Sequence, residues 1–301
     1  MQNIIFLVVC ISLGIIFKKY KIFKGDAYLV VSNIILYICL PATTLLYASE
    51  AKIESAYILP ILMPWILYVL GFLFFKVVGK LTKMHKHSEG VLIMTGSIPS
   101  VSFVGFPIFE MFYGAEGLHI GVLMSQAGSF LVCATFGVIT ASYYAAEKPS
   151  FREIALNVLR FPVFLTFIIA ILMNVSDIHF APIVAELLKK LAAPFGLLAM
   201  FSIGLQIELP KKNAIFFNLS WGLFFKLILS PLIIFVLFVV VLKQKGSVAE
   251  ICLLGAALGP MNTAAIIASK YGLNPPLASA MVGIGIPISL IGVMTLYFLI
   301  H

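Results

Sequence analysis

Two long apolar runs of this chain are broken at matching places. Small residues and a proline interrupt one run over residues 95–100 and the other over residues 254–263. A Tyr-Gly pair follows each break, Tyr113-Gly114 and Tyr271-Gly272, and the two pairs lie about half the chain apart. Helices that are discontinuous at corresponding positions of two halves are the best sequence pointer to the binding site of a membrane carrier. The breaks therefore constrain both the fold and the place to look for a ligand.

The composition excludes a water-soluble protein. Hydrophobic residues make up 62% of the chain and charged residues 11%, whereas soluble domains have about 45–50% and about 25%. The apolar runs are continuous, unlike the alternating segments of about ten residues in a membrane β-barrel. Since lipid offers the backbone no hydrogen-bond partner, each run must be helical. We expect spans over residues 4–17, 27–48, 57–79, 90–112, 118–145, 154–174, 191–206, 217–242, 249–269 and 276–300.

These spans divide into two halves of five, residues 1–146 and 151–301. Because five is an odd number, the second half enters the membrane upside down. Pro41 in the second span matches Pro194 in the seventh, and the broken fourth span matches the broken ninth. We therefore expect an all-α integral membrane protein of ten transmembrane helices, built as two inverted five-helix repeats.

The basic residues indicate how the chain is oriented. Cytoplasmic loops carry an excess of Lys and Arg. Alternate loops hold only Lys52, Lys243 and Lys245, so the bias predicts a multi-pass protein of the cell inner membrane with both termini outside the cytoplasm. Because the net charge of +8 lies in short loops, we expect no nucleic-acid partner. The basic residues of the predicted inner loops are Lys18, Lys19, Lys21, Lys24, Lys80, Lys83, Lys86, Lys148, Arg152, Arg160, Lys211, Lys212 and Lys270.

Nothing in the sequence indicates an enzyme, a metal or a cofactor. The four cysteines, Cys10, Cys39, Cys133 and Cys252, lie inside apolar runs without a C-x-x-C pattern, which is typical of small packing residues. No histidine has a second ligand at metal spacing. The motifs of nucleotide-driven pumps, metalloproteases and serine hydrolases are missing from the sequence. We expect no catalytic residue.

Pro99 and Pro260 are the centres of the two breaks. Each proline removes a backbone donor and clashes with the preceding turn, and Gly96 and Gly259 beside them favour unwinding. A simple proline kink in a packed helix is the alternative, but the two breaks recur in register. The half-helix that begins after each break offers free N–H groups and about half a positive charge. Two such ends in the membrane would attract an anion.

Polar side chains near the breaks are candidate substrate contacts. Ser100 and Ser102 follow the first proline, and Asn262 and Thr263 follow the second. The alternative for each is a hydrogen bond to its own helix. Gln126 in the fifth span faces protein rather than lipid, where it would contact either the substrate or a neighbouring helix.

Two charged residues inside spans are candidates for ion coupling. Intramembrane ionisable residues mark functional sites by default. Glu110 lies near the outer end of the fourth span, where it would alternatively reach interfacial water. Lys226 lies in the eighth span, and the alternative there is a lysine whose stem is buried while its ammonium reaches the membrane surface.

Several motifs are similar to those of one known family. Residues 103–114 read FVGFPIFEMFYG, which looks like a G-x-P-(apolar)-x-x-x-Y-G stretch, and residues 199–205 read AMFSIGL, which is close to AMFSLGL. Lys226 with Pro231, residues 21–23 and Pro41 complete the set. Together these motifs resemble the auxin efflux carrier family, which includes plant carriers and bacterial relatives, and they follow its order over nearly the whole chain.

The resemblance implies a fold in which the fourth and ninth helices unwind and cross near mid-membrane. It further implies a scaffold of helices one, two, six and seven and a moving part of helices three to five and eight to ten. Transport would follow an elevator-type alternating-access mechanism, and the substrate would be a small organic anion such as a carboxylate. The chain departs from the family at Ser100, where Asn is usual, and at Pro260, because plant carriers place the proline near Ala264. An auxin-like substrate therefore does not follow.

The leading hypothesis is a secondary active transporter of an organic anion, with H⁺ or Na⁺ as candidate coupling ions and the lipid bilayer as its surroundings. A sodium-coupled symporter of the bile-acid type is the alternative among carriers, and it would need several convergent oxygen ligands. A membrane sensor or signalling module without transport is the alternative from another class. Assembly as a homodimer is left open.

Overall fold

The computed structural model describes the whole chain except residues 1, 24–26, 52–56, 147–157, 160 and 208–214. All regular elements in the described part are helices, some of them π-helical turns labelled η. The first half contains α1 (Gln2–Lys19), α2 (Ala27–Ile34), η1 (Ile35–Cys39), α3 (Leu40–Ser49), α4 (Ile58–Thr82), α5 (Lys86–Ser97), η3 (Val101–Gly105), α6 (Phe106–Leu123), η4 (Met124–Phe130), η5 (Cys133–Gly137) and α7 (Val138–Tyr144).

The second half begins, within the described residues, with α9 (Pro162–Val175), so the predicted start of the sixth span at residue 154 lies outside them. The remaining elements are α10 (Pro182–Ala192), α11 (Phe195–Gln206), α12 (Phe216–Phe224), η7 (Phe225–Leu229), α13 (Ser230–Ile234), η8 (Phe235–Val241), α14 (Ser247–Ala257), α15 (Asn262–Lys270) and α16 (Pro275–Ile300).

The long helices are apolar on both faces, as membrane helices are. In α4, Met63 and Leu67 are completely buried, whereas Val69 and Leu73 on the other side are more than half exposed. Within the described residues, five stretches are long and apolar enough to cross a membrane, and two further apolar helices, α9 and α14, are shorter. The prediction of an all-helical, multi-pass membrane protein is confirmed. The five stretches are Ala27–Ser49, Ile58–Thr82, Val101–Tyr144, Phe216–Val241 and Pro275–Ile300.

The two Tyr-Gly pairs are turns. Gly114 interrupts α6 with φ 59° and ψ −140°, so the stretch Val101–Tyr144 contains two helical segments. Gly272 separates α15 from α16 with φ 70°. Both angles lie in the left-handed region, which only glycine adopts without strain. The glycines therefore allow the chain to reverse after each half-helix.

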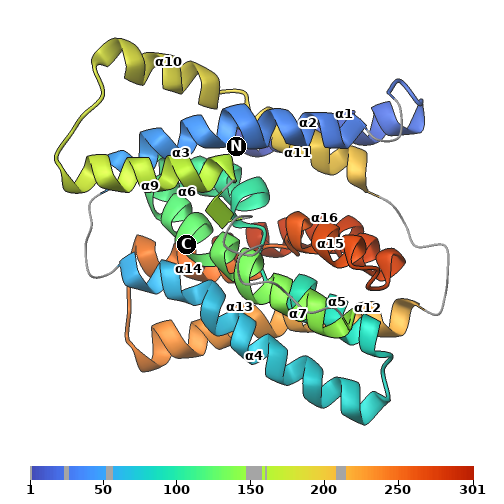
Figure 1. Cartoon of the computed structure of the whole chain (residues 1–301). Coiled ribbons are helices and arrows are strands. Elements are labelled where there is room, and N and C mark those ends of the chain that lie inside the picture. The colour runs from blue at the N-terminus through green and yellow to red at the C-terminus, as the bar shows by residue number, and fades with distance from the viewer. Residues whose placement is uncertain (1, 24–26, 52–56, 147–157, 160, 208–214) are drawn as a thin grey trace.

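The helices form two groups (Figure 1). The upper group in this view contains α1, α2, α3, α9, α10 and α11, with α1 packed on α11 and α3 packed on α9. The lower group contains α4, α5, α7 and α12 to α16, with α4 packed on α5 and α14. Contacts between the groups are made chiefly by α6 and η3, which lie against α3 and α11.

Backbone contact holds α1 against α11. A Cβ atom on Gly204 would lie 2.2 Å from the carbonyl oxygen of Ile11, and one on Gly14 would lie 2.3 Å from that of Phe201. Small residues at such crossings let membrane helices approach closely enough for dispersion forces to hold them. The AMFSIGL stretch of α11 therefore provides the surface on which α1 packs.

Helical structure begins earlier than the predicted seventh span, residues 191–206. The helix starts at Pro182 as α10, and α11 continues it after an interruption at Ala193 and Pro194. The sequence did not indicate where α10 starts because charged residues interrupt its apolar pattern. Two of them, Lys190 and Glu186, form an ion pair of 2.9 Å along the surface of α10. Pro41 lies correspondingly in the first turn of α3.

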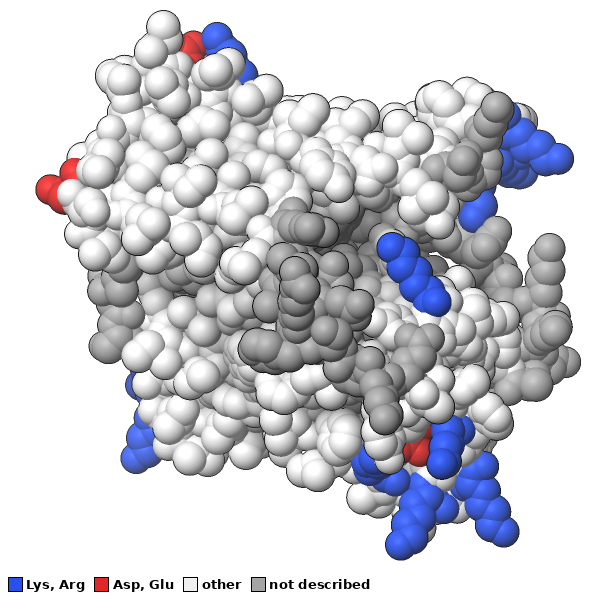
Figure 2. Space-filling view, in the orientation of Figure 1, with Lys and Arg blue, Asp and Glu red and all other residues white. Residues whose placement is uncertain are grey.

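Basic side chains gather at one end of the helices. Figure 2 shows most of them on the right, where α1 ends and α4 gives way to α5. The residues that the structure describes there include Lys18, Lys19, Lys80, Lys83 and Lys86. Seven of the loop residues behind the predicted bias lie outside the described residues: Lys24, Lys52, Lys148, Arg152, Arg160, Lys211 and Lys212.

Candidate substrate site at the crossing of two broken helices

Both predicted breaks are present. Helix α5 ends at Ser97 and α14 ends at Ala257, and in each case a proline follows shortly afterwards. A proline disfavours helical angles in the residue before it, and Ile98 before Pro99 is extended with φ −96° and ψ 118°. The chain resumes a helical path only at η3 and α15. Each run therefore consists of two half-helices joined by a short extended segment.

The two extended segments cross and pair with each other. Pro99 and Pro260 form an antiparallel β-bridge. Since neither proline has an N–H group, the following residues donate instead: Ser100 N to Gly259 O at 2.9 Å and Met261 N to Ile98 O at 3.0 Å. The pairing gives backbone groups inside the protein the partners that lipid could not offer. It also brings four half-helix ends together at one point.

The predicted polar side chains lie on the half-helices that begin at the crossing. Ser100 is buried, and Ser102, Asn262 and Thr263 are half-buried. No hydrogen bond joins the side chains of Ser102, Asn262 or Thr263 to another residue in the described part of the chain. Their hydroxyl and amide groups are therefore available to a ligand. The first turns of η3 and α15 add backbone N–H groups that lack an intrahelical partner, except that of Val101, which donates to the carbonyl oxygen of Pro99 at 3.0 Å.

Gln126 lies on η4, which packs on η3. Its side chain is almost fully buried, and its Nε2 atom donates to the Ser125 hydroxyl at 3.4 Å. The Gln126 Oε1 atom and the Ser129 hydroxyl are buried without any hydrogen-bond partner. Buried polar atoms are normally paired, so each exception needs an explanation. The Ser97 hydroxyl at the end of α5 is also buried without a partner, so the neighbourhood of the first break contains three unused polar atoms.

The predicted role of one glycine needs correction. Gly96 lies inside α5, not in the unwound segment, and a Cβ atom there would be 2.6 Å from the Phe75 ring. Its place is explained by close packing rather than by easier unwinding. Gly259 does lie in the break, where a Cβ atom would be 2.8 Å from both Ile286 Cα and the Ser289 hydroxyl oxygen of α16.

Lys226 is deeply buried, so the alternative of an ammonium group that reaches the membrane surface is wrong. Its side chain is 0% exposed, and Nζ donates to the carbonyl oxygen of Ala256 at 3.2 Å. That carbonyl belongs to the last turn of α14, immediately before the break. The lysine lies in η7, which packs on both α5 and α14.

Glu110 lies away from the crossing. It is exposed on α6 and lines a pocket of about 220 Å³ between α1, α6 and α11. The other lining residues are Phe6, Leu7, Pro107, Met111 and Gly196. This pocket therefore lies at the boundary between the two helix groups.

A sequence profile of the membrane transport protein family matches residues 1–298 of the chain. The chain is a member of this family. The resemblance to auxin efflux carriers is thereby confirmed, because the profile is that of the family to which they belong. The chain is also 24% identical over 302 residues to an uncharacterized transporter of Methanocaldococcus jannaschii, a match covering 97% of this chain and 96% of the relative. The membership supports a membrane transport role rather than catalysis.

Two carboxylates of this membrane transport protein were not singled out in the sequence. Glu89 and Glu250 stand at the same distance in sequence before Pro99 and Pro260 and lie in the first turns of α5 and α14. This common spacing was the signal that could have found them.

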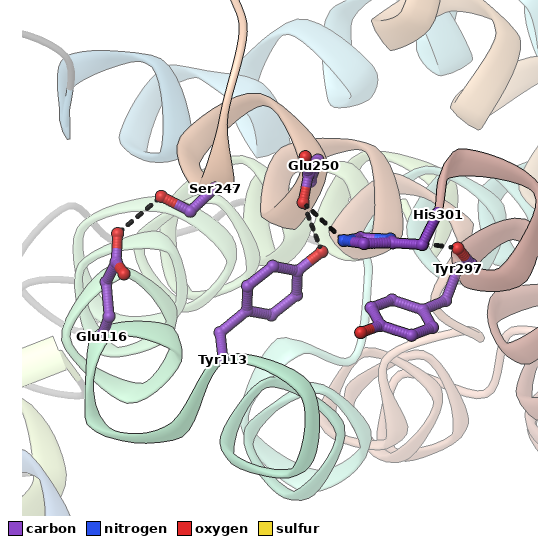
Figure 3. Close-up of polar contacts among 6 residues, drawn as sticks. All are labelled: Tyr113, Glu116, Ser247, Glu250, Tyr297 and His301. Carbon is purple, nitrogen blue, oxygen red and sulfur yellow. Dashed lines mark hydrogen bonds and ion pairs between the residues drawn. The ribbon is translucent and has the colours of Figure 1, made fainter.

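Each of these carboxylates accepts a hydrogen bond from a tyrosine. Glu89 accepts from the Tyr144 hydroxyl and forms an ion pair of 3.1 Å with Lys76. Glu250 accepts from the Tyr113 hydroxyl at 3.0 Å, and its carboxylate lies 3.6 Å from His301 Nε2 (Figure 3). In this membrane transport protein, a tyrosine of a neighbouring helix thus binds the first turn of each broken helix, at the end away from the crossing.

Proposed function

We propose that the protein is a secondary active transporter that carries a small organic anion, such as a carboxylate, across the cell inner membrane. The observation that carries this proposal is the pairing of Pro99 with Pro260, which brings the N-termini of η3 and α15 to one point. Each helix N-terminus carries about half a positive charge. An anion placed there would accept hydrogen bonds from backbone N–H groups that have no other partner.

The side chains at the crossing suit such a substrate. The Asn262 amide can donate two hydrogen bonds, and the hydroxyls of Ser100, Ser102 and Thr263 can each donate one. Gln126 would add an amide from the neighbouring η4. A hydrogen bond to a charged group contributes about 1.5–3 kcal/mol, so a few of these contacts would give useful but reversible binding.

The two helix groups suit alternating access. In this proposal the group of α1, α2, α3, α9, α10 and α11 is the scaffold, and the remaining helices carry the substrate as an elevator. The halves 1–146 and 151–301 would be inverted repeats. This view is supported by the equal spacing of Glu89 before Pro99 and Glu250 before Pro260, and by the Tyr-Gly turn that follows each break. Alternating access in such folds is largely rigid-body movement around a fixed site.

The orientation follows from charge. The end that carries Lys18, Lys80 and Lys86 would face the cytoplasm. Helix α1 runs toward this end and α16 runs away from it (Figure 1), which supports both termini outside the cytoplasm. A reporter fused after His301 measures this directly, and a cytoplasmic signal would contradict the ten-span arrangement.

Two other functions are less well supported. A sodium-coupled symporter needs several convergent oxygen ligands, and near the crossing only Gln126 and Asn262 are obvious. Proton coupling through Glu110 would have to act at the boundary pocket, away from the crossing. A membrane sensor without transport has no specific observation in its favour. A homodimer remains compatible with each of these functions.

Uptake measurements on purified variants in proteoliposomes test the proposal. Asn262→Ala and Ser100→Ala should each weaken uptake of a carboxylate from a substrate panel about tenfold, because each removes a hydrogen bond to a charged group. Pro260→Ala should abolish uptake for a different reason. It restores a backbone donor and lets α14 and α15 form one straight helix. The N–H groups at the start of α15 would then form hydrogen bonds within that helix and would no longer be free for a substrate.

Thermal melting shows whether the variants are folded, and Gly292→Ala, at a position of α16 with open space around it, is the control. If Asn262→Ala and Pro260→Ala both transport normally, the substrate site lies elsewhere.

A further inference from the structure

Lys226 lies in the middle of a membrane-spanning helix. Its span runs from Phe216 to Val241, so at about 1.5 Å per residue the lysine lies about 15 Å along it. The hydrocarbon core is about 30 Å thick. A four-carbon stem cannot carry the ammonium group to either membrane surface from that depth, which agrees with its 0% exposure. The charge must therefore be balanced inside the protein.

The C-terminal end of the broken helix α14 supplies the negative charge that balances the Lys226 ammonium group. Lys226 Nζ donates to Ala256 O at 3.2 Å, and this oxygen is among the last four carbonyls of α14, which have no intrahelical donor. The C-terminus of a helix carries about half a negative charge. Among the described residues no carboxylate lies within ion-pair distance of Lys226. Backbone carbonyl dipoles are thus its only identified counter-charge.

This position is one that a metal cation would suit. In carriers with discontinuous helices, unwound carbonyls and the C-terminal ends of half-helices coordinate the coupling Na⁺. An ammonium group is a compact charge with three donors and can satisfy the same carbonyls. Helix η7 packs on both α5 and α14, the two helices that break. A positive charge on η7 therefore balances the negative C-terminal ends of α5 and α14 beside the crossing.

We infer that the Lys226 ammonium group is a built-in cation that takes the place of a coupling sodium ion at the C-terminal end of α14. Its presence makes transport independent of sodium and keeps the broken helix ends together. This inference rests on the proposed carrier function for its consequence in transport. Its consequence for ion binding can be tested without any substrate.

The first experiment measures thermal melting of the purified protein in sodium chloride and in choline chloride at about 0.15 M. Choline is too large for a site built for an ammonium group. The native protein should melt at the same temperature in both salts. Lys226→Ala leaves the carbonyls unpaired and a space beside them, so sodium should raise its melting temperature by about 2 °C or more relative to choline.

Two further variants keep the result interpretable. Lys226→Met fills the space with an apolar chain of similar length, so it should melt lower than the native protein and should not respond to sodium. Lys76→Ala removes a lysine of α4 that is paired with Glu89 of α5 and should not respond either. A sodium response of the native protein, or a folded Lys226→Ala without one, would overturn the inference.

The second experiment measures uptake of the carboxylate panel into proteoliposomes with a sodium or a choline gradient. Native uptake should be equal in the two gradients, and Lys226→Ala should show uptake at least about threefold faster with sodium. Native uptake that requires sodium would overturn the inference and leave the carrier function standing. If no carboxylate is taken up by any variant, the proposed function fails, and the melting experiment alone decides the role of Lys226.

Discussion

The unpaired oxygens of Gln126 and Ser129 lower the stability of the folded protein. A buried polar atom without a partner costs about 1–3 kcal/mol, and both atoms are enclosed beside the first half-helix. Functional sites are where such costs are tolerated, because a ligand supplies the missing partner. Thr95, by contrast, is equally buried but bonds to the Val91 carbonyl of its own helix at 2.8 Å. Thr44 of α3 and Ser142 of α7 also have buried hydroxyls without a partner, so it is the position of Gln126 and Ser129 beside the crossing that makes them candidate ligand contacts.

Gln126→Met separates stability from function. The substitution removes the unpaired oxygen and keeps the length of the side chain, so the melting temperature should stay the same or rise. Uptake of the transported carboxylate should fall about tenfold, because a hydrogen bond to a charged group is lost. Thr140→Val is the matched control, since Thr140 is buried and pairs with the Tyr68 hydroxyl; it should melt lower and transport normally. Unchanged uptake by Gln126→Met would falsify its role as a substrate contact.

At the scale of the helices, local sequence signals predicted the two breaks, but contacts between residues far apart in the chain were not predicted. Pro99 and Pro260 act on the turn that precedes them, so a short stretch of sequence was enough to find both ends of the crossing. The start of α10 was missed because its charged residues do not look like a span. The depth of Lys226 was missed because apolar periodicity cannot show which face of a lipid-embedded helix is buried.

The pairing of Glu89 with Tyr144 joins residues far apart in the chain, so no local pattern could predict it. That the two broken helices cross was expected only from the family resemblance, and the antiparallel pairing of Pro99 with Pro260 was not predicted. Sequence reasoning thus located the candidate residues along the chain, and the structure was needed to see which of them meet.

Gly204→Ala tests the contact between α1 and α11. The added methyl group would lie 2.2 Å from the Ile11 carbonyl oxygen, which belongs to backbone and cannot rotate away. The helices must separate, at a cost of about 1–3 kcal/mol, and the melting temperature should fall. Gly292→Ala is the control, because no atom lies within 4 Å of the added group, and its helix propensity should leave melting unchanged or slightly raised. Equal melting of the two variants would contradict the backbone contact.

The boundary between the two helix groups is where an elevator has to slide. It consists mainly of α6 and η3 against α3 and α11, and the pocket beside Glu110 opens there. Contacts within each group are far more extensive than contacts across this boundary. A rigid-body movement would therefore break few contacts, whereas a movement inside either group would disturb close packing such as that of Gly14 on Gly204.

A reversible link across this boundary should stop transport. A Cβ atom on Gly196 of α11 would lie 4.0 Å from Pro107 Cβ of α6, within the usual Cβ–Cβ separation of about 3.5–4.5 Å for a disulfide. The double variant Gly196→Cys with Pro107→Cys should therefore form a bond on mild oxidation, lose uptake of the transported carboxylate and regain it on reduction. Each single variant should transport equally in both conditions, and the four native cysteines are buried and unpaired. Full uptake by the oxidised double variant, with the bond verified by mass spectrometry, would mean that α6 and α11 do not move apart during transport, and the elevator proposal would then be wrong.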